Sequence, residues 1–239
     1  MTSNVSAGTA SGTVKAPGFD RGAAVTRSLI GYGVLAGPFY LAVGLIQAFV
    51  REGFSFSRHA LSVLANGPGG WVQTANFALT GLMVLAAAVG FARVLGPTSR
   101  ATIWFLGAFG ASMIVAAIFP ADPVDGFPVG TPVGPPTSIS TTGLIHFIAG
   151  MIGLTALGIS ALVAARAMSH RGQRPVARIS LASGLGILIA FFGGGALSSG
   201  PIGILGIWLA VIIGWAWLAT ISVHLYRAAP DPRCLANAD

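Results

Sequence analysis

Six apolar stretches of roughly twenty residues each constrain this chain more than any other feature of its sequence. A helix needs about 20 apolar residues to cross the hydrocarbon core of a bilayer. In lipid, a single apolar segment of this length satisfies its own backbone hydrogen bonds only as a helix. We therefore predict an all-α membrane protein whose transmembrane domain, residues 28–226, is a bundle of six helices. The predicted helices span residues 28–50, 74–95, 101–119, 143–165, 179–197 and 202–226.

The composition excludes the ordinary soluble classes of protein. Charged residues make up 8% of the chain, against about 25% in soluble domains, so a soluble fold would expose large apolar patches. The net charge of +7 does not indicate a nucleic-acid partner, because the basic residues separate the apolar stretches instead of clustering. We expect membrane lipids as partners, no nucleic acid and no cofactor, and the sequence identifies no protein partner. Arginine supplies 12 of the 13 basic residues, and with abundant Ala and Gly this bias favours a bacterial cytoplasmic membrane as the location.

The basic residues also predict the orientation of the chain. Short cytoplasmic loops of membrane proteins carry an excess of Lys and Arg. Six crossings put 11 basic residues on one side of the membrane and only Arg51 and Arg58 on the other. This distribution predicts that both termini are cytoplasmic. The 11 residues are Lys15, Arg21, Arg27, Arg93, Arg100, Arg166, Arg171, Arg174, Arg178, Arg227 and Arg233.

The connections between the apolar stretches are unequal. Residues 1–27 are rich in Ser, Thr, Gly and Ala and predict a flexible cytoplasmic tail, and residues 227–239 form a second, C-terminal tail. The first two outer loops are long, and long loops in compact proteins are often functional. In the first, Ser57 is a suitable helix start and Asn66 a suitable stop. We predict a short helix at the membrane interface between them.

Small and polar residues mark particular helix faces. Gly33, Gly37 and Gly44 recur at helical spacing in the first helix and predict close packing against a neighbouring helix. The outer ends of several helices also carry polar residues that face inward. These residues predict a small polar cavity that opens outward, and they are Gln47, Gln73, Asn76, Thr80, Thr142 and His146.

The outer loops carry a family resemblance. The residues concerned are Phe54-Ser55, Arg58 to Leu64, Gly67, Gly70 to Gln73, Asn76-Phe77 and Gly81-Leu82, followed by Phe119, Asp122-Pro123, Gly126 and His146. With this motif the sequence, over about residues 30–225, resembles the bacterial membrane proteins known as the domain of unknown function 998 family. The resemblance implies a multi-pass membrane protein. It implies no established reaction, so no catalytic residue is carried over.

Two hypotheses about the outer polar residues involve no chemical reaction. In the first they are architectural: Asp122 and Asp125 cap the loop or pair with Arg51 or Arg58, and His146 hydrogen-bonds to Asn76 or Gln73. In the second they bind a lipid headgroup or a small amphiphile at the outer face, since arginine suits phosphate recognition and polar residues inside a bundle are functional by default. The candidate ligand-binding residues are Arg58, His59, Trp71, Gln73, Asn76 and His146.

The alternative function is a membrane-embedded hydrolase with its site at the outer leaflet. His59 and Ser62 are three residues apart and would share a helix face, where an Asp could orient the histidine. The candidate catalytic residues are His59, Ser62, Asp122 and His146. A divalent-metal site formed by His59, Asp122, Asp125 and His146 is a variant of this hypothesis. The chain has neither a Gly-x-Ser-x-Gly elbow nor a His-Glu-x-x-His helix, so we assign no metal ligand.

Overall fold

The computed structural model describes residues 19–96, 99–136, 138–197 and 200–232, and it is helical. Each of its six α-helices is long and apolar enough to cross a membrane. Within these described ranges there is no strand, and only one isolated bridge, Val124 with Phe127, occurs in a loop. This confirms the predicted all-α architecture with six spans. The elements are α1 (Arg21–Val50), the 3₁₀ helix η1 (Leu61–Ala65), α2 (Gly70–Leu95), α3 (Arg100–Ile118), α4 (Thr141–His170), α5 (Arg174–Ala196) and α6 (Pro201–Ala228).

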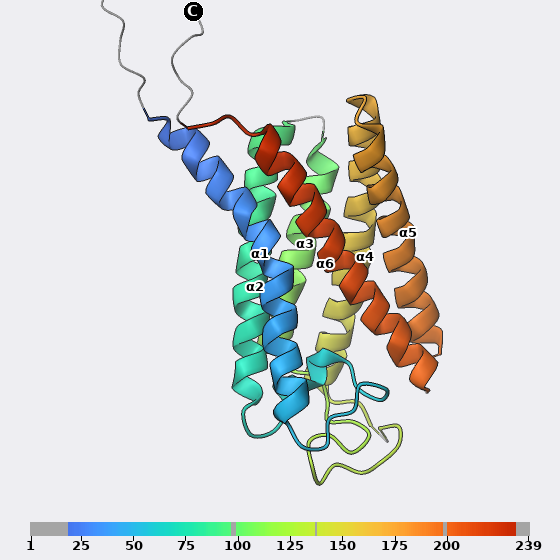
Figure 1. Cartoon of the computed structure of the whole chain (residues 1–239). Helices are drawn as coiled ribbons and strands as arrows, with labels where there is room; N and C mark the ends of the chain where they lie inside the picture. Colours follow the sequence, from blue (N-terminus) through green and yellow to red (C-terminus); the bar gives the residue numbers. More distant parts are fainter. Residues whose placement is uncertain (1–18, 97–98, 137, 198–199, 233–239) are drawn as a thin grey trace, which may run out of the picture.

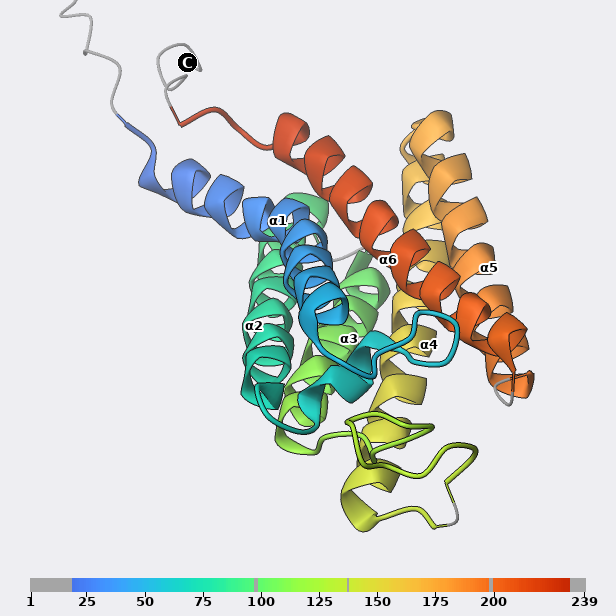
Figure 2. The same cartoon turned by 60° about the horizontal axis from the view of Figure 1, so that its bottom comes forward.

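The helices form a closed ring. Each helix packs against the next along the chain, and α6 returns to pack against α1. Figures 1 and 2 show the two ends of this bundle. We call the end with Arg21 and Ala228 the terminal end, and the end with the long connections 51–69 and 119–140 the loop end.

The first helix begins earlier than predicted. It starts at Arg21 and not at residue 28, so residues 21–27 belong to a helix and not to the predicted tail. The reason is a cap: the Asp20 carboxylate accepts hydrogen bonds from the backbone N–H groups of Gly22 and Ala23. The Asp20 N–H in turn donates to the Pro232 carbonyl at 2.9 Å, which ties the start of α1 to the segment after α6. Residues 1–18 and 233–239, which hold most of both predicted tails, lie outside the described part of the chain.

The helices around the fourth connection are also longer than predicted. Helix α4 continues to His170 and α5 starts at Arg174, so only residues 171–173 connect them. Arginine is a good helix former, so a charged residue marks where the hydrocarbon ends and not where the helix ends. Arg166, Arg174 and Arg178 therefore stand on helices and not in a loop.

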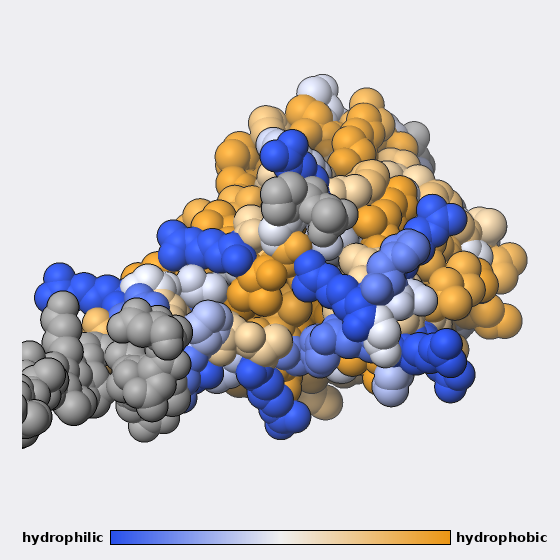
Figure 3. All heavy atoms as spheres, turned by 90° about the horizontal axis from the view of Figure 1, so that it is seen from above, coloured by the Kyte–Doolittle hydropathy of each residue, from blue (hydrophilic) through white to orange (hydrophobic). Residues whose placement is uncertain are grey.

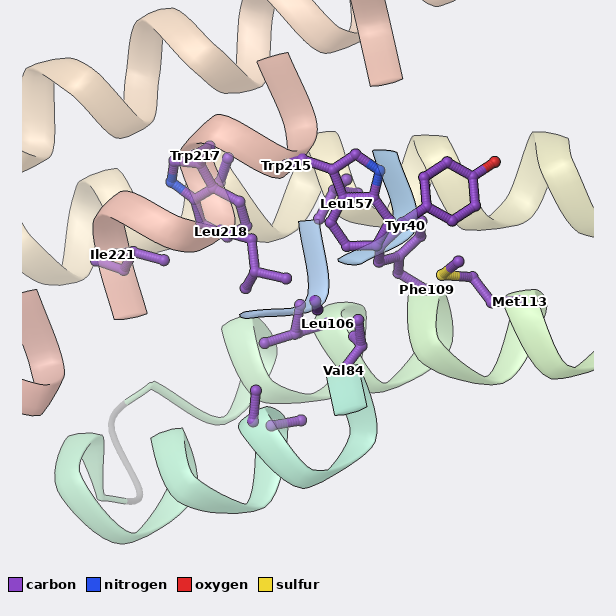
Figure 4. Packing of buried hydrophobic residues seen from close by; sticks show 14 of the residues in the cluster. Tyr40, Val84, Leu106, Phe109, Met113, Leu157, Trp215, Trp217, Leu218 and Ile221 are labelled. Atoms are coloured by element: carbon purple, nitrogen blue, oxygen red, sulfur yellow. The ribbon is translucent and has the colours of Figure 1, made fainter. Parts of the chain in front are cut away.

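Small residues allow the close packing of the core. Gly33, Gly37 and Gly44 are all buried in α1, as the sequence predicts. A Cβ atom at Gly37 would lie 2.8 Å from the Cβ atom of Trp215, so only glycine lets α6 approach α1 this closely. Figure 4 shows the large side chains that fill the centre of the ring, and the ones fully or almost fully buried there include Val84, Leu106, Leu157, Trp217 and Leu218.

Candidate functional site

The first loop is organised around Arg51. Its guanidinium group donates hydrogen bonds to the backbone carbonyls of Leu64 and Asn66. The same group lies over the ring of Phe127 in the second loop, 4.9 Å from the ring centroid. Arg51 therefore fixes η1 against the end of α1 and joins the two long loops.

His59 forms the second junction between these loops. The side chain is fully buried. Its Nδ1 atom accepts a hydrogen bond from the Ser55 N–H at 2.9 Å, so the ring proton is on Nε2, which donates to the Asp125 carbonyl at 3.1 Å. Burial, with a smaller contribution from the Arg58 charge, lowers the pKa of His59 from its ordinary value of 6.5. His59 is therefore a neutral ring at pH 7, and both of its nitrogens are bound to the backbone.

The two loop aspartates act as caps and pairs, which agrees with the architectural hypothesis. The Asp122 carboxylate accepts from the backbone N–H of Ser140 at 2.9 Å and from its hydroxyl, directly before α4. The Asp125 carboxylate accepts from the Gly134 N–H at 2.8 Å and lies 3.7 Å from the exposed guanidinium group of Arg58. Arg58 is therefore paired within the protein.

The contacts seen here do not assemble the predicted hydrolase arrangement. Ser62 lies in η1, whereas His59 precedes η1 and has both ring nitrogens engaged elsewhere. Across the described ranges, no three His, Cys, Asp or Glu side chains gather as a metal site, so the alternative metal set is not brought together. The catalytic roles of the candidate residues stay predictions.

Most of the residues predicted to line a polar cavity instead form a chain of hydrogen bonds between α1 and α2. Gln47 donates to the Gln73 side chain at 2.9 Å, and Asn76 donates to the same oxygen at 3.2 Å. Asn76 also donates to the Tyr40 carbonyl at 3.0 Å and accepts from the Thr80 hydroxyl at 3.3 Å. These buried side chains bond to each other, and they are not among the residues that line the neighbouring cavity. Trp71, another candidate ligand residue, lies at the start of α2 and is 73% exposed.

A cavity of about 220 Å³ does lie beside this chain, and its walls are mainly apolar. We call it the loop-end cavity; all six helices and residues 60–62 contribute to it. Aromatic rings in mutual contact follow one wall: Tyr40 and Trp215 have centroids 5.3 Å apart, as do Phe109 and Trp215. Figure 4 shows these three side chains near Met113, which also lines the cavity.

A few polar groups interrupt the apolar wall. His146 Nδ1 donates to the Phe119 carbonyl at 2.8 Å, because a carbonyl oxygen can only accept, and this leaves Nε2 as the nitrogen available to a ligand. Ser62 also lines the cavity, and its hydroxyl bonds to none of the residues that the structure describes. A hydrogen-bond donor and an acceptor are therefore present in a largely apolar space.

The exposure of lining residues on α4 and α6 indicates that the cavity opens between the loop-end halves of these helices. Phe147 lines it and is 63% exposed, and Trp208 on the facing helix is half-buried. Figures 1 and 2 both show the loop-end tip of the α5–α6 hairpin diverging from α4. The mouth is thus bounded by apolar side chains along the flank of the bundle.

Of the predicted site residues, only Ser62 and His146 line this cavity. The aromatic lining was missed, although the sequence holds a signal for it. Trp208, Val211 and Trp215 are spaced by three and four residues and share one face of α6. Trp215 lies well inside an apolar stretch, whereas membrane tryptophans are enriched at the interfaces.

Comparison with known proteins places the chain in a family. A family model described as a protein of unknown function (DUF998) matches residues 34–224, from within α1 to the last turns of α6. No curated protein and no solved structure matches the chain. The match covers most of the sequence and agrees with the resemblance carried by the loop motif. The chain is therefore a multi-pass membrane protein that belongs to the DUF998 family.

Proposed function

We propose that this protein binds an amphiphile whose apolar chain occupies the loop-end cavity. The observation that carries the proposal is the apolar, aromatic-rich lining of a space of about 220 Å³. Ligand pockets are usually lined by apolar side chains with a few placed polar groups. An apolar cavity of about 150 Å³ already holds benzene, so this one is large enough for a segment of an acyl chain.

The polar groups of the cavity select the head of the ligand. The Ser62 hydroxyl can donate a hydrogen bond, and His146 Nε2 can accept one. Arg58 already pairs with Asp125, so we do not propose that it binds a phosphate group of the ligand. The chemistry favours an uncharged head with hydroxyl, ester or amide groups, such as that of a monoacylglycerol.

The distribution of charge supports an orientation in which the loop end faces outward. Figure 3 shows hydrophilic side chains spread over the terminal end. The described arginines there are Arg21, Arg27, Arg93, Arg100, Arg166, Arg171, Arg174, Arg178 and Arg227, against Arg51 and Arg58 at the loop end. By the positive-inside rule the terminal end is cytoplasmic, in a bacterial cytoplasmic membrane. Segment 61–65 then lies near the outer interface, and the mouth beside Phe147 opens to the outer leaflet.

Filling the cavity tests the proposal. Gly150 lines the cavity, and a Cβ atom there would meet nothing within 4 Å, so Gly150→Leu adds volume without a backbone clash. Gly107→Leu is the matched control, because Gly107 is equally unobstructed on α3 but does not line the cavity. The probe is a monoacylglycerol with a photoreactive group in its chain, cross-linked to the purified full chain and mapped by mass spectrometry.

We expect the wild type and Gly107→Leu to be labelled at residues of the cavity. We expect Gly150→Leu to bind the probe about tenfold more weakly, which corresponds to a loss of 1.4 kcal/mol. Equal labelling of Gly150→Leu, or labelling confined to residues outside the cavity, would refute the proposal.

A further inference from the structure

A second hollow lies at the opposite end of the bundle, between α4 and α5. It has a volume of about 810 Å³, and three of its lining residues are Arg166, Arg174 and Arg178. Arg174 and Arg178 are four residues apart on α5 and so share one helix face, which is opposed by Arg166 of α4. We call this hollow the arginine groove.

The three arginines have no counter-ion among the residues that the structure describes. The described ion pairs are Arg27 with Asp231 and Arg58 with Asp125. The acidic residues described at the terminal end are Asp20 and Asp231, and both belong to the junction of α1 with the segment after α6. Three like charges facing one groove repel each other, so an anion bound between them relieves this repulsion.

Apart from Ser169, the other residues that line the groove are apolar. Leu162 on α4 and Leu181 and Leu185 on α5 continue from the arginines toward the middle of the bundle. A ligand that fits both parts has an anionic group at the membrane surface and a hydrocarbon chain in the bilayer. Basic pockets between transmembrane helices bind the headgroups of anionic lipids in this way.

We propose that the arginine groove binds an anionic phospholipid from the leaflet at the terminal end. The phosphate lies between Arg166, Arg174 and Arg178, where guanidinium groups form paired hydrogen bonds to its oxygens. One acyl chain lies along Leu181 and Leu185. This site is separate from the loop-end cavity and does not depend on the ligand proposed there.

The test is lipid retention by the full chain, measured by native mass spectrometry in detergent. Phosphatidylglycerol and phosphatidylcholine are offered in equal amounts. The groove variant carries Arg166→Gln, Arg174→Gln and Arg178→Gln. The control variant carries Arg93→Gln, Arg100→Gln and Arg227→Gln, which removes the same charge from exposed residues at the same end that do not line the groove.

The wild type and the control variant should retain phosphatidylglycerol in preference to phosphatidylcholine. The groove variant should bind phosphatidylglycerol about a hundredfold more weakly. Equal loss in both triple variants would overturn the proposal, because it would show a general effect of net charge.

Two further measurements use a single variant and the wild type. Arg178→Gln alone should give an intermediate loss, which guards against misfolding of the triple variant. Inorganic phosphate at the same concentration as the lipid should not displace phosphatidylglycerol from the wild type. Complete displacement would overturn the lipid assignment, because it would show a site for free phosphate.

Discussion

Replacing Asn76 with leucine removes the centre of the polar chain between α1 and α2. The Asn76 side chain takes part in three hydrogen bonds, to the Tyr40 carbonyl, to Gln73 and from Thr80. Leucine has a similar volume and is readily accommodated in a membrane helix, so the main change is the loss of these bonds.

The size of the effect follows from the number of bonds lost. Side-chain hydrogen bonds between membrane helices contribute on average about 0.6 kcal/mol each, because the unfolded chain in the membrane also finds partners. Only the bond to Tyr40 runs between helices, whereas the bonds to Gln73 and Thr80 lie within α2 and contribute about 0.2–0.5 kcal/mol each. Loss of all three should lower the free energy of unfolding of Asn76→Leu by about 1–1.5 kcal/mol. The Gln73 oxygen still accepts from Gln47, but the buried Thr80 hydroxyl loses its acceptor, which adds to the cost.

Reversible unfolding in mixed detergent micelles measures this difference. The control is Thr220→Val, because Thr220 is exposed on α6 and its hydroxyl bonds only to the Ala216 carbonyl of its own helix. The control should change stability by less than about 0.5 kcal/mol. The double variant Gln73→Leu with Asn76→Leu should be more stable than the sum of the single changes implies, since the two share a bond. Unchanged or increased stability of Asn76→Leu would refute the conclusion that the hydrogen bonds between α1 and α2 stabilise the fold.

Two further predictions concern packing and pH. Gly90→Ala should lower the free energy of unfolding by about 1–3 kcal/mol, because the new Cβ atom would lie 2.8 Å from the backbone nitrogen of Ile30. Gly107→Ala, which meets nothing within 4 Å, should not lower it. The pKa of His59 is lower in the folded chain than its ordinary value of 6.5, so at a pH below 6.5 the unfolded chain binds a proton more readily than the folded chain. The contribution of His59 to stability therefore falls as the pH falls. Thermal unfolding between about pH 7.5 and about pH 5.5 should show a smaller loss on acidification in His59→Gln than in the wild type; an identical loss would contradict this role.

The number and type of the helices could be predicted from the sequence because one physical requirement decides both. An apolar stretch of this length has to be a helix in lipid. The helix ends were less predictable, because hydropathy reports the hydrocarbon boundary. Helix α1 begins at Arg21 through a cap supplied by Asp20, and α5 begins at Arg174 in a charged segment that hydropathy assigns to a loop.

The candidate site was harder to predict, because its contacts join residues far apart in the chain. The sequence predicts His59 as a candidate site residue, but its partner Asp125 is 66 residues away, and the bond goes to the Asp125 backbone. A backbone partner leaves no pattern of residue types in the sequence. The loop-end cavity is a space that six helices fail to fill, so its existence depends on helix crossing angles, which hydrophobic spacing does not specify.

The loop network joins the two long connections and reaches the α5–α6 hairpin through Trp208. Arg51 and His59 tie the connection 51–69 to the connection 119–140, whereas α5 and α6 are joined to each other through the short segment 197–200. The indole of Trp208 links this hairpin to the network through a hydrogen bond to the His59 carbonyl at 3.1 Å. Because α6 also packs against α1 and α5 packs against α4, an outward movement of the loop-end tip of this hairpin would have to break the Trp208 bond, so Trp208 couples the width of the cavity mouth to the loop network.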